Sequence, residues 1–418
     1  MNPTTFFAFL GGLLALAFIA NRLYRLTRVP DVIVLMIVGV ILGPVLGWIQ
    51  PGHFESITRI FGTLALILIL FEGGLELNLR DTLRHFPGGV LLALLGYYIS
   101  MGLVALVAWK AYHFAPRPAL LIGAVFGCVS GSIALPVLQQ IRVTRPVRIT
   151  LLVEASLGDV LGVLTVSVLL SLGSGAVVTG FVAGTVLKVL ACIVGAIVAG
   201  VLWTRVLRTL AEQRFWQVMT LSIVLLVYAG AQAASQGGLI AVFAFGLTLA
   251  NLHQADPWGV ASTMGLGPGE PQHHVQILSF HSELAFLVRS FFFILLGVIV
   301  KISGLQGYVL LTAGVFVALA VARWLAVTAS SWTWGEKDAS EKRLALLFFP
   351  RGLITAVLAI EVIQARGAAF SFLPALAFAI IFLTNLLVIV ASVRAGTPPS
   401  QSPPAPLRGD EPVTSTAS

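Results

Sequence analysis

The sequence predicts an all-α polytopic membrane protein with about 13 transmembrane helices, and three observations carry that prediction. Of its 418 residues, 58% are apolar and only 10% are charged, whereas a soluble protein of this length carries about 25% charged residues. The apolar residues form long runs, most of them near the roughly 20 residues that a membrane-spanning helix needs. Short segments rich in Arg, Gly or Pro separate the runs and leave no room for a soluble domain.

The predicted helices follow the apolar runs between polar, Gly or Pro residues. In chain order they cover residues 4–21, 32–48, 57–78, 88–109, 118–140, 149–173, 177–203, 215–234, 237–251, 280–300, 305–328, 343–366 and 371–394. Cys128 and Cys192 both lie inside spans, which favours packing residues over a disulfide or a metal site. Residues 396–418 are rich in Pro and Ser, as is typical of a disordered tail.

Lys and Arg alternate between the two sides of this predicted bundle. Loops after odd-numbered helices hold 14 of these cations, and loops after even-numbered helices hold five. Because cytoplasmic loops are enriched in Lys and Arg, we expect an external N-terminus and a cytoplasmic C-terminus in the plasma membrane, the inner membrane of a bacterium. The cations are scattered singly and form no basic face, so the formal charge of +8 does not indicate nucleic-acid binding.

Segment 252–279 is an exception among the odd-numbered loops. It contains no Lys or Arg but includes His253, His273 and His274. These histidines either respond to cytoplasmic pH or are ordinary solvated loop residues.

The fifth and twelfth helices contain predicted interruptions near the middle of the membrane. The interrupting residues are Ser130, Gly131, Ser132 and Pro136 in the fifth helix and Pro350, Arg351 and Gly352 in the twelfth. Such residues disfavour a continuous helix and leave backbone groups free to face a cavity, where they can ligate an ion. Ser130 and Ser132 are therefore further candidates for binding the ion or proton. Since five and twelve differ by seven, the pattern predicts two inverted six-helix repeats, with the binding site between them. Coincidence is the alternative, because Pro and Gly are common in membrane helices.

The predicted repeats divide the chain into four parts. The first repeat covers residues 1–173 and the second covers 212–395, with a linker helix and loop at 174–211 and the tail at 396–418.

Charged residues inside the spans are the candidates for function, because an unpaired charge in hydrocarbon is costly. In the sixth helix, Asp159 shares a face with Ser156, while Glu154 points elsewhere. In the third helix, Arg80 follows Glu76 by four residues, a spacing that predicts an ion pair between them at the membrane interface.

Other charges in the spans have no partner on their own helix. Glu72 is a candidate ion ligand on these grounds. We expect Glu283, Arg289, Arg323 and Glu361 to pair with other helices and Lys188 to extend toward the membrane surface.

Three motifs resemble those of the monovalent cation:proton antiporters. They are F-E-G-G-L-E-L at 71–77, E-A-S-L-G-D at 154–159 and P-R-G-L at 350–353, and the resemblance covers roughly residues 1–395. It implies an NhaA-like fold and a homodimer in membrane lipid. It also implies exchange of Na⁺ or K⁺ for protons through an elevator-like movement of a core around the crossed fifth and twelfth helices.

The resemblance also implies roles for single residues. Asp159 would bind the cation or the proton, Ser156 would be a neighbouring hydroxyl ligand of the alkali cation, and Arg351 would form an ion pair with Glu154. Two departures leave the choice of ion open. Gly158 stands where relatives have Asn or a second Asp, and Ser130, Gly131 and Ser132 stand where one branch has Thr-Asp-Pro.

Competition at one carboxylate is the mechanism that these residues predict. When Asp159 is desolvated, a proton and a dehydrated cation become comparable ligands. Moving the neutralised site costs little, whereas moving a bare carboxylate costs much, which enforces exchange, with one proton for one cation as the simplest stoichiometry. A cation channel, a transport-inactive sensor and an organic-anion symporter are the alternatives. There is no nucleotide-binding glycine loop, so neither an enzyme activity nor a cofactor is expected.

Overall fold

The computed structural model describes residues 3–27, 29–48, 55–76, 79–171, 178–210, 215–235, 237–254, 271–300, 306–334 and 339–395. Within these ranges the chain is helical, without a β-strand. The predictions for the tail at 396–418, for most of segment 252–279 and for the side chains of its three histidines lie outside the described residues.

The helices follow the predicted spans closely. They are α1 (Pro3–Thr27), α2 (Asp31–Val40), α3 (Glu55–Glu76), α4 (Leu79–Tyr112), α5 (Pro116–Phe126), α6 (Gly131–Gln140), α7 (Arg145–Ser171), α8 (Val178–Leu210), α9 (Trp216–Ser235), α10 (Gly238–Gln254), α12 (Pro271–Ile299), α14 (Val309–Ser330), α15 (Ala339–Leu347), α16 (Leu353–Arg366) and α17 (Leu373–Ala395). A π-helical turn at Ile41–Val45 extends α2, and it contains Pro44, which lacks the N–H of a regular helix. The prediction of an all-helical membrane fold is confirmed.

Two helices begin well before the predicted span. α4 starts at Leu79 rather than at residue 88, and α12 starts at Pro271 rather than at residue 280. Hydrogen bonding can continue a helix into polar turns beyond the apolar core of the bilayer, so hydropathy marks the membrane part and not the helix end. Among the described residues, nine helices are long and apolar enough to cross a membrane, and three shorter apolar helices accompany them. The chain is an integral membrane protein.

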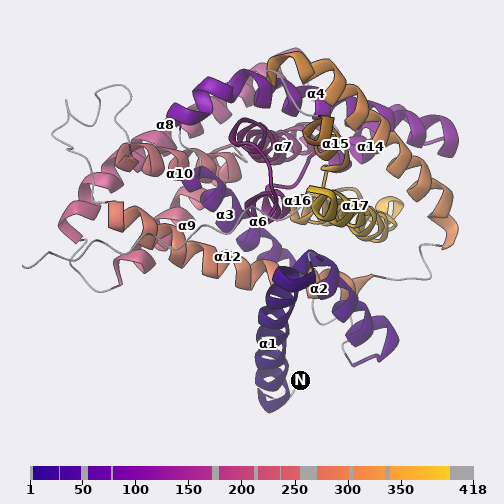
Figure 1. Cartoon of the computed structure of the whole chain (residues 1–418), viewed down its shortest axis with the longest axis horizontal. Helices are drawn as coiled ribbons and strands as arrows, with labels where there is room; N and C mark the ends of the chain where they lie inside the picture. The colour runs from indigo at the N-terminus through magenta and orange to yellow at the C-terminus, as the bar shows by residue number, and fades with distance from the viewer. Residues whose placement is uncertain are drawn as a thin grey trace, which may run out of the picture.

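The helices pack into two groups. In the first, which we call the α12 group, α12 packs on α2 and α3, and α10 packs on α3, α8 and α9. In the second, the crossover group, α4 packs on α5, α7 and α14, α6 packs on α7, and α17 packs on α14, α15 and α16. Figure 1 shows α8, α9 and α10 on one side of the molecule and α14 to α17 on the other, with α3, α6 and α7 between them. The groups meet where α3 contacts α6 and α16.

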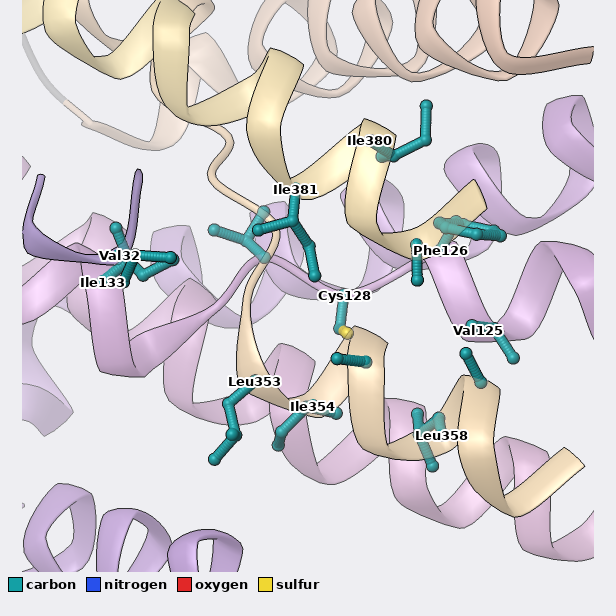
Figure 2. Packing of buried hydrophobic residues seen from close by; sticks show 14 of the residues in the cluster. Val32, Val125, Phe126, Cys128, Ile133, Leu353, Ile354, Leu358, Ile380 and Ile381 are labelled. Atoms are coloured by element: carbon teal, nitrogen blue, oxygen red, sulfur yellow. The ribbon is translucent and has the colours of Figure 1, made fainter. Parts of the chain in front are cut away.

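The interruptions of the fifth and twelfth helices are present, and the two interrupted segments cross. α5 and α6 are separated at residues 127–130, and α15 and α16 are separated at residues 348–352. The N–H of Ser130 donates to the carbonyl of Pro350 at 2.8 Å. Figure 2 shows the two extended segments passing each other beside Cys128, with Ile133 and Leu353 at the starts of the helices that follow. Backbone amides and carbonyls of four helix ends therefore gather at the centre of the fold.

Pro136 does not break the fifth helix, contrary to the prediction. It lies inside α6, which runs from Gly131 to Gln140, and Gly131 and Ser132 also belong to this helix, in its first turn. Proline removes one helical hydrogen bond but can stay within a helix when another group satisfies the freed carbonyl. The break precedes α6 instead, at Gly127 to Ser130.

Gly352 allows the two segments to cross. A methyl group at this position would overlap the hydroxyl of Ser130 and lie 2.8 Å from Cδ1 of Ile133. We expect Gly352→Ala to lower the stability by about 1–3 kcal/mol, the usual cost of overpacking a core, measured as a lower Tm in detergent. Gly102→Ala is the matched control, because a Cβ at Gly102 meets nothing within 4 Å and alanine is the better helix former. Equal Tm values for wild type and Gly352→Ala would contradict this account of the crossing.

Candidate functional site

Asp159 lies on α7 and faces the start of α6. Its side chain is buried, at 2% exposure, and its Oδ2 accepts a hydrogen bond of 3.1 Å from the N–H of Gly131. A Cβ at Gly131 would lie 3.0 Å from that oxygen, so the glycine lets the carboxylate approach closely. The first amides of a helix are unpaired and lie at the positive end of its dipole, which is a favourable place for an anion.

A cavity of about 760 Å³ extends from Asp159 between the two helix groups. α6 and α7 form one wall, and α3, α10 and α12 form the other. Of the residues predicted for the site, those that line it are Glu72, Gly131, Ser132, Pro136, Ser156 and Asp159. The second carboxylate oxygen of Asp159, Oδ1, has no hydrogen-bond partner among the described residues. A cation or proton could therefore bind this oxygen without displacing a protein partner.

The hydroxyl groups predicted near the ion lie at two different places. Ser156 lines the cavity beside Asp159. Ser132 also lines it, and its hydroxyl is 2.9 Å from that of Ser130. Ser130 is not among the lining residues and belongs to the crossing, where its backbone contacts Pro350. The structure thus brings Ser156 and Ser132 to the cavity with Asp159, whereas Ser130 lies at the crossing and outside the cavity lining.

Acidic residues of α3 face the same cavity. Both Glu72 and Glu76 line it, together with Ser279 and Ser282 of α12. The predicted partner of Glu76, Arg80, has a side chain outside the described part of the structure. The lining holds three acids, Glu72, Glu76 and Asp159, against two arginines, Arg148 and Arg289, and this excess of acidic groups favours the approach of cations.

Glu154 forms its ion pair with Arg323 of α14, so the predicted pair of Glu154 with Arg351 is wrong. Nη1 of Arg323 donates to Oε1 of Glu154 in a short contact. The two side chains are only 3% and 2% exposed, and Nε of Arg323 also donates to the carbonyl of Ala345 at 2.7 Å. The pair therefore joins α7 to α14 and to the last turn of α15.

The guanidinium of Arg351 lies at the C-terminal end of α5 and not beside Glu154. Its Nε donates to the carbonyl of Phe126 at 2.7 Å, and its Nη2 lies 3.4 Å from the carbonyl of Gly127. The carbonyls at a helix C-terminus lack helical partners and carry partial negative charge, so a guanidinium stabilises them. Arg351 at the end of α5 and Asp159 at the start of α6 together compensate the two ends of the broken helix.

Two polar residues of α17 complete the crossing, and neither was among the residues predicted from the sequence. The N–H of Arg351 donates to Oγ1 of Thr384 at 3.1 Å, and Nδ2 of Asn385 donates to the carbonyl of Arg351 at 2.9 Å. Both side chains are buried. An adjacent Thr and Asn in the middle of an apolar span is the signal that could have identified them, because buried polar groups in membranes need partners.

The fold and site define a polytopic membrane transporter with two interrupted helices that cross beside a buried carboxylate. The chain belongs to the sodium/hydrogen exchanger family: the family described as "Sodium/hydrogen exchanger, transmembrane" matches residues 12–395. Members of this family are transporters and not enzymes, and the chain is a cation:proton antiporter. The comparisons give no support to the channel alternative.

Individual relatives agree with this assignment. Na(+)/H(+) antiporter 1 of Methanocaldococcus jannaschii is 25% identical over 380 residues, which are 85% of this chain and 82% of that protein. The K(+)/H(+) antiporter NhaP of Alkalimonas amylolytica is 26% identical over 330 residues, 77% of this chain and 54% of that protein. The solved structure of the sodium proton antiporter MjNhaP1 from M. jannaschii at pH 8 matches with a TM-score of 0.70 and 23% identity. That match covers 94% of this chain and 96% of the other and shows the shared fold.

Proposed function

We propose that the protein exchanges one monovalent cation, Na⁺ or K⁺, for one proton, and that both bind in turn to Asp159. The observation that carries this proposal is the position of the carboxylate. It is buried at the start of α6, its Oδ1 has no partner among the described residues, and it lines a cavity that Ser156 and Ser132 also line.

The exchange follows from the cost of charge in a membrane. A carboxylate removed from water must be neutralised, either by a proton or by a cation that has lost part of its hydration shell. Hydroxyl oxygens of Ser156 and Ser132 are suitable replacements for lost water. The neutral site can cross the barrier and the bare carboxylate cannot, so that each passage carries either a cation or a proton. Since Gly158 supplies no second acid, the proposed exchange is electroneutral.

Orientation and assembly are part of the same proposal. The cavity lies among the ends of α3, α6 and α7, and the Arg-rich loops beyond these ends are assigned to the cytoplasm by the positive-inside rule. The N-terminus is then external, in a bacterial inner membrane. The equivalent interruptions of α5–α6 and α15–α16 support two inverted repeats, 1–173 and 212–395. A homodimer in membrane lipid rests on the resemblance to the antiporters.

Proteoliposomes containing the purified protein test the proposal. Na⁺, K⁺ and Li⁺ are offered in turn at several pH values, and the internal pH is followed with a dye. We expect at least one of these cations to drive proton movement, with no net current on a solid-supported membrane. A current that reverses sign with membrane potential would contradict one-for-one exchange, and cation flux without proton movement would contradict antiport.

A further inference from the structure

Arg289 of α12 connects the two helix groups beside the ion site. Its Nη2 lies 3.3 Å from Oδ2 of Asp31 at the start of α2, and the two side chains are 13% and 11% exposed. Its Nη1 donates to the backbone carbonyl of Ser132 in α6 at 2.8 Å. Asp31 and Arg289 belong to the α12 group, whereas Ser132 belongs to the crossover group. The guanidinium is therefore anchored on one group and bonded to the other.

The carbonyl of Ser132 is available because of Pro136. In an α-helix the carbonyl of residue 132 accepts a hydrogen bond from the N–H of residue 136, but proline has no N–H. Pro136 lies inside α6, so this carbonyl cannot receive its helical bond and Arg289 supplies a donor. The same first turn of α6 contains Gly131, whose N–H binds Asp159.

Other charged groups lie around Arg289 in the cavity wall. They are Glu72 and Glu76 of α3 and Arg148 and Asp159 of α7, while Asp31 of α2 contacts the guanidinium from outside the cavity lining. Within the described part of the chain, Asp31 forms an ion pair with the guanidinium, so Asp31 holds it in position. The ring of Phe286 lies 5.9 Å away on the same helix.

We propose that Arg289 is a positioning residue of the transport site, held by Asp31. It fixes the carbonyl of Ser132, and with it the first turn of α6, against α12 and thereby stabilises the conformation in which the cavity reaches Asp159 from the side of Glu76. The inference rests on the proposed function, because transport would move the crossover group, which carries Asp159, past α12 and would break this hydrogen bond. Arg289 would then determine how much more tightly the cation binds from the side of Glu76 than from the opposite side of the membrane.

Arg289→Gln tests the inference in the full-length protein in proteoliposomes. The KM for the transported cation is measured separately on each face of the membrane, and the readout is the ratio of the two values. We expect the ratio to change by about tenfold, as when a hydrogen bond to a charged group is lost from one of two states. Arg289→Lys keeps the charge beside Asp31 and should restore part of the ratio. A purely structural role would lower the amount of folded protein and the transport rate without changing the ratio.

Pro136→Ala provides an independent test of the same hydrogen bond. The new N–H at position 136 can donate to the Ser132 carbonyl and competes with Arg289 for it. The ratio of the two KM values should therefore shift in the same direction as in Arg289→Gln. The double variant should show little further shift, because both changes remove one interaction.

Each outcome decides the inference. Additive shifts, or an unchanged ratio in an active Arg289→Gln, would overturn it. If Arg289→Gln fails to fold, an unchanged ratio in both Arg289→Lys and Pro136→Ala would overturn it instead. Failure of the wild type to exchange cations for protons would refute the proposed function itself and is seen in the same assay before any variant is made.

Discussion

Asp159→Asn is expected to reduce cation:proton exchange to the level of empty liposomes while the protein still folds. Asparagine has nearly the same size, and its side-chain carbonyl can accept the hydrogen bond from the N–H of Gly131. The packing of α7 against α6 is therefore preserved. The amide has no charge to neutralise, so it neither releases a proton nor attracts a cation, and the competition that drives exchange is lost.

Two measurements separate this loss from misfolding. The Tm in detergent should stay near the wild-type value, and added Na⁺ or K⁺ should raise the Tm of the wild type but not of Asp159→Asn, because only a bound ligand stabilises the native state. Glu361→Gln is the matched control: it removes another acid from a predicted span, on α16, that is not among the cavity-lining residues. Exchange at the wild-type rate by Asp159→Asn would remove the basis of the proposed mechanism.

The helices and both interruptions could be predicted because they depend on local properties of the chain. Apolar runs set the spans, and the Gly, Ser and Pro residues near positions 131 and 351 disfavour one continuous helix through each span. Asp159 and Ser156 share a face of one helix, which is why their common presence at the cavity follows from sequence spacing. The prediction that Pro136 interrupts the fifth helix was wrong because a proline inside a helix and a proline that ends a helix have the same appearance in the sequence.

The partners of charged residues could not be predicted in the same way. Glu154 and Arg323 are 169 positions apart, and nothing on α7 or α14 alone indicates that they face each other. The resemblance to antiporters suggested Arg351, a cation at the crossing, but backbone carbonyls of α5 occupy its guanidinium. Thr384 and Asn385 are adjacent polar residues in an apolar span, but their partner could not be predicted because both contact the backbone of Arg351.

Glu154→Gln is expected to destabilise the protein strongly, by about 3–5 kcal/mol, because it leaves the guanidinium of Arg323 buried without its counter-charge. The loss should appear as a markedly lower Tm in detergent and a smaller folded fraction after purification. The double variant Glu154→Gln with Arg323→Gln should recover part of this loss, because removing both charges avoids an unpaired one. Recovery stays partial because Arg323 also donates to the carbonyl of Ala345.

The matched comparison is Glu154→Gln combined with Arg351→Gln. If Arg323 is the partner of Glu154, this second double variant should be less stable than Glu154→Gln alone, because the carbonyls of Phe126 and Gly127 lose their donor while Arg323 stays unpaired. If Arg351→Gln, and not Arg323→Gln, recovered the stability lost in Glu154→Gln, the predicted pair of Glu154 with Arg351 would be correct after all. The two double variants differ only in which arginine is removed, so the sign of the stability change identifies the partner.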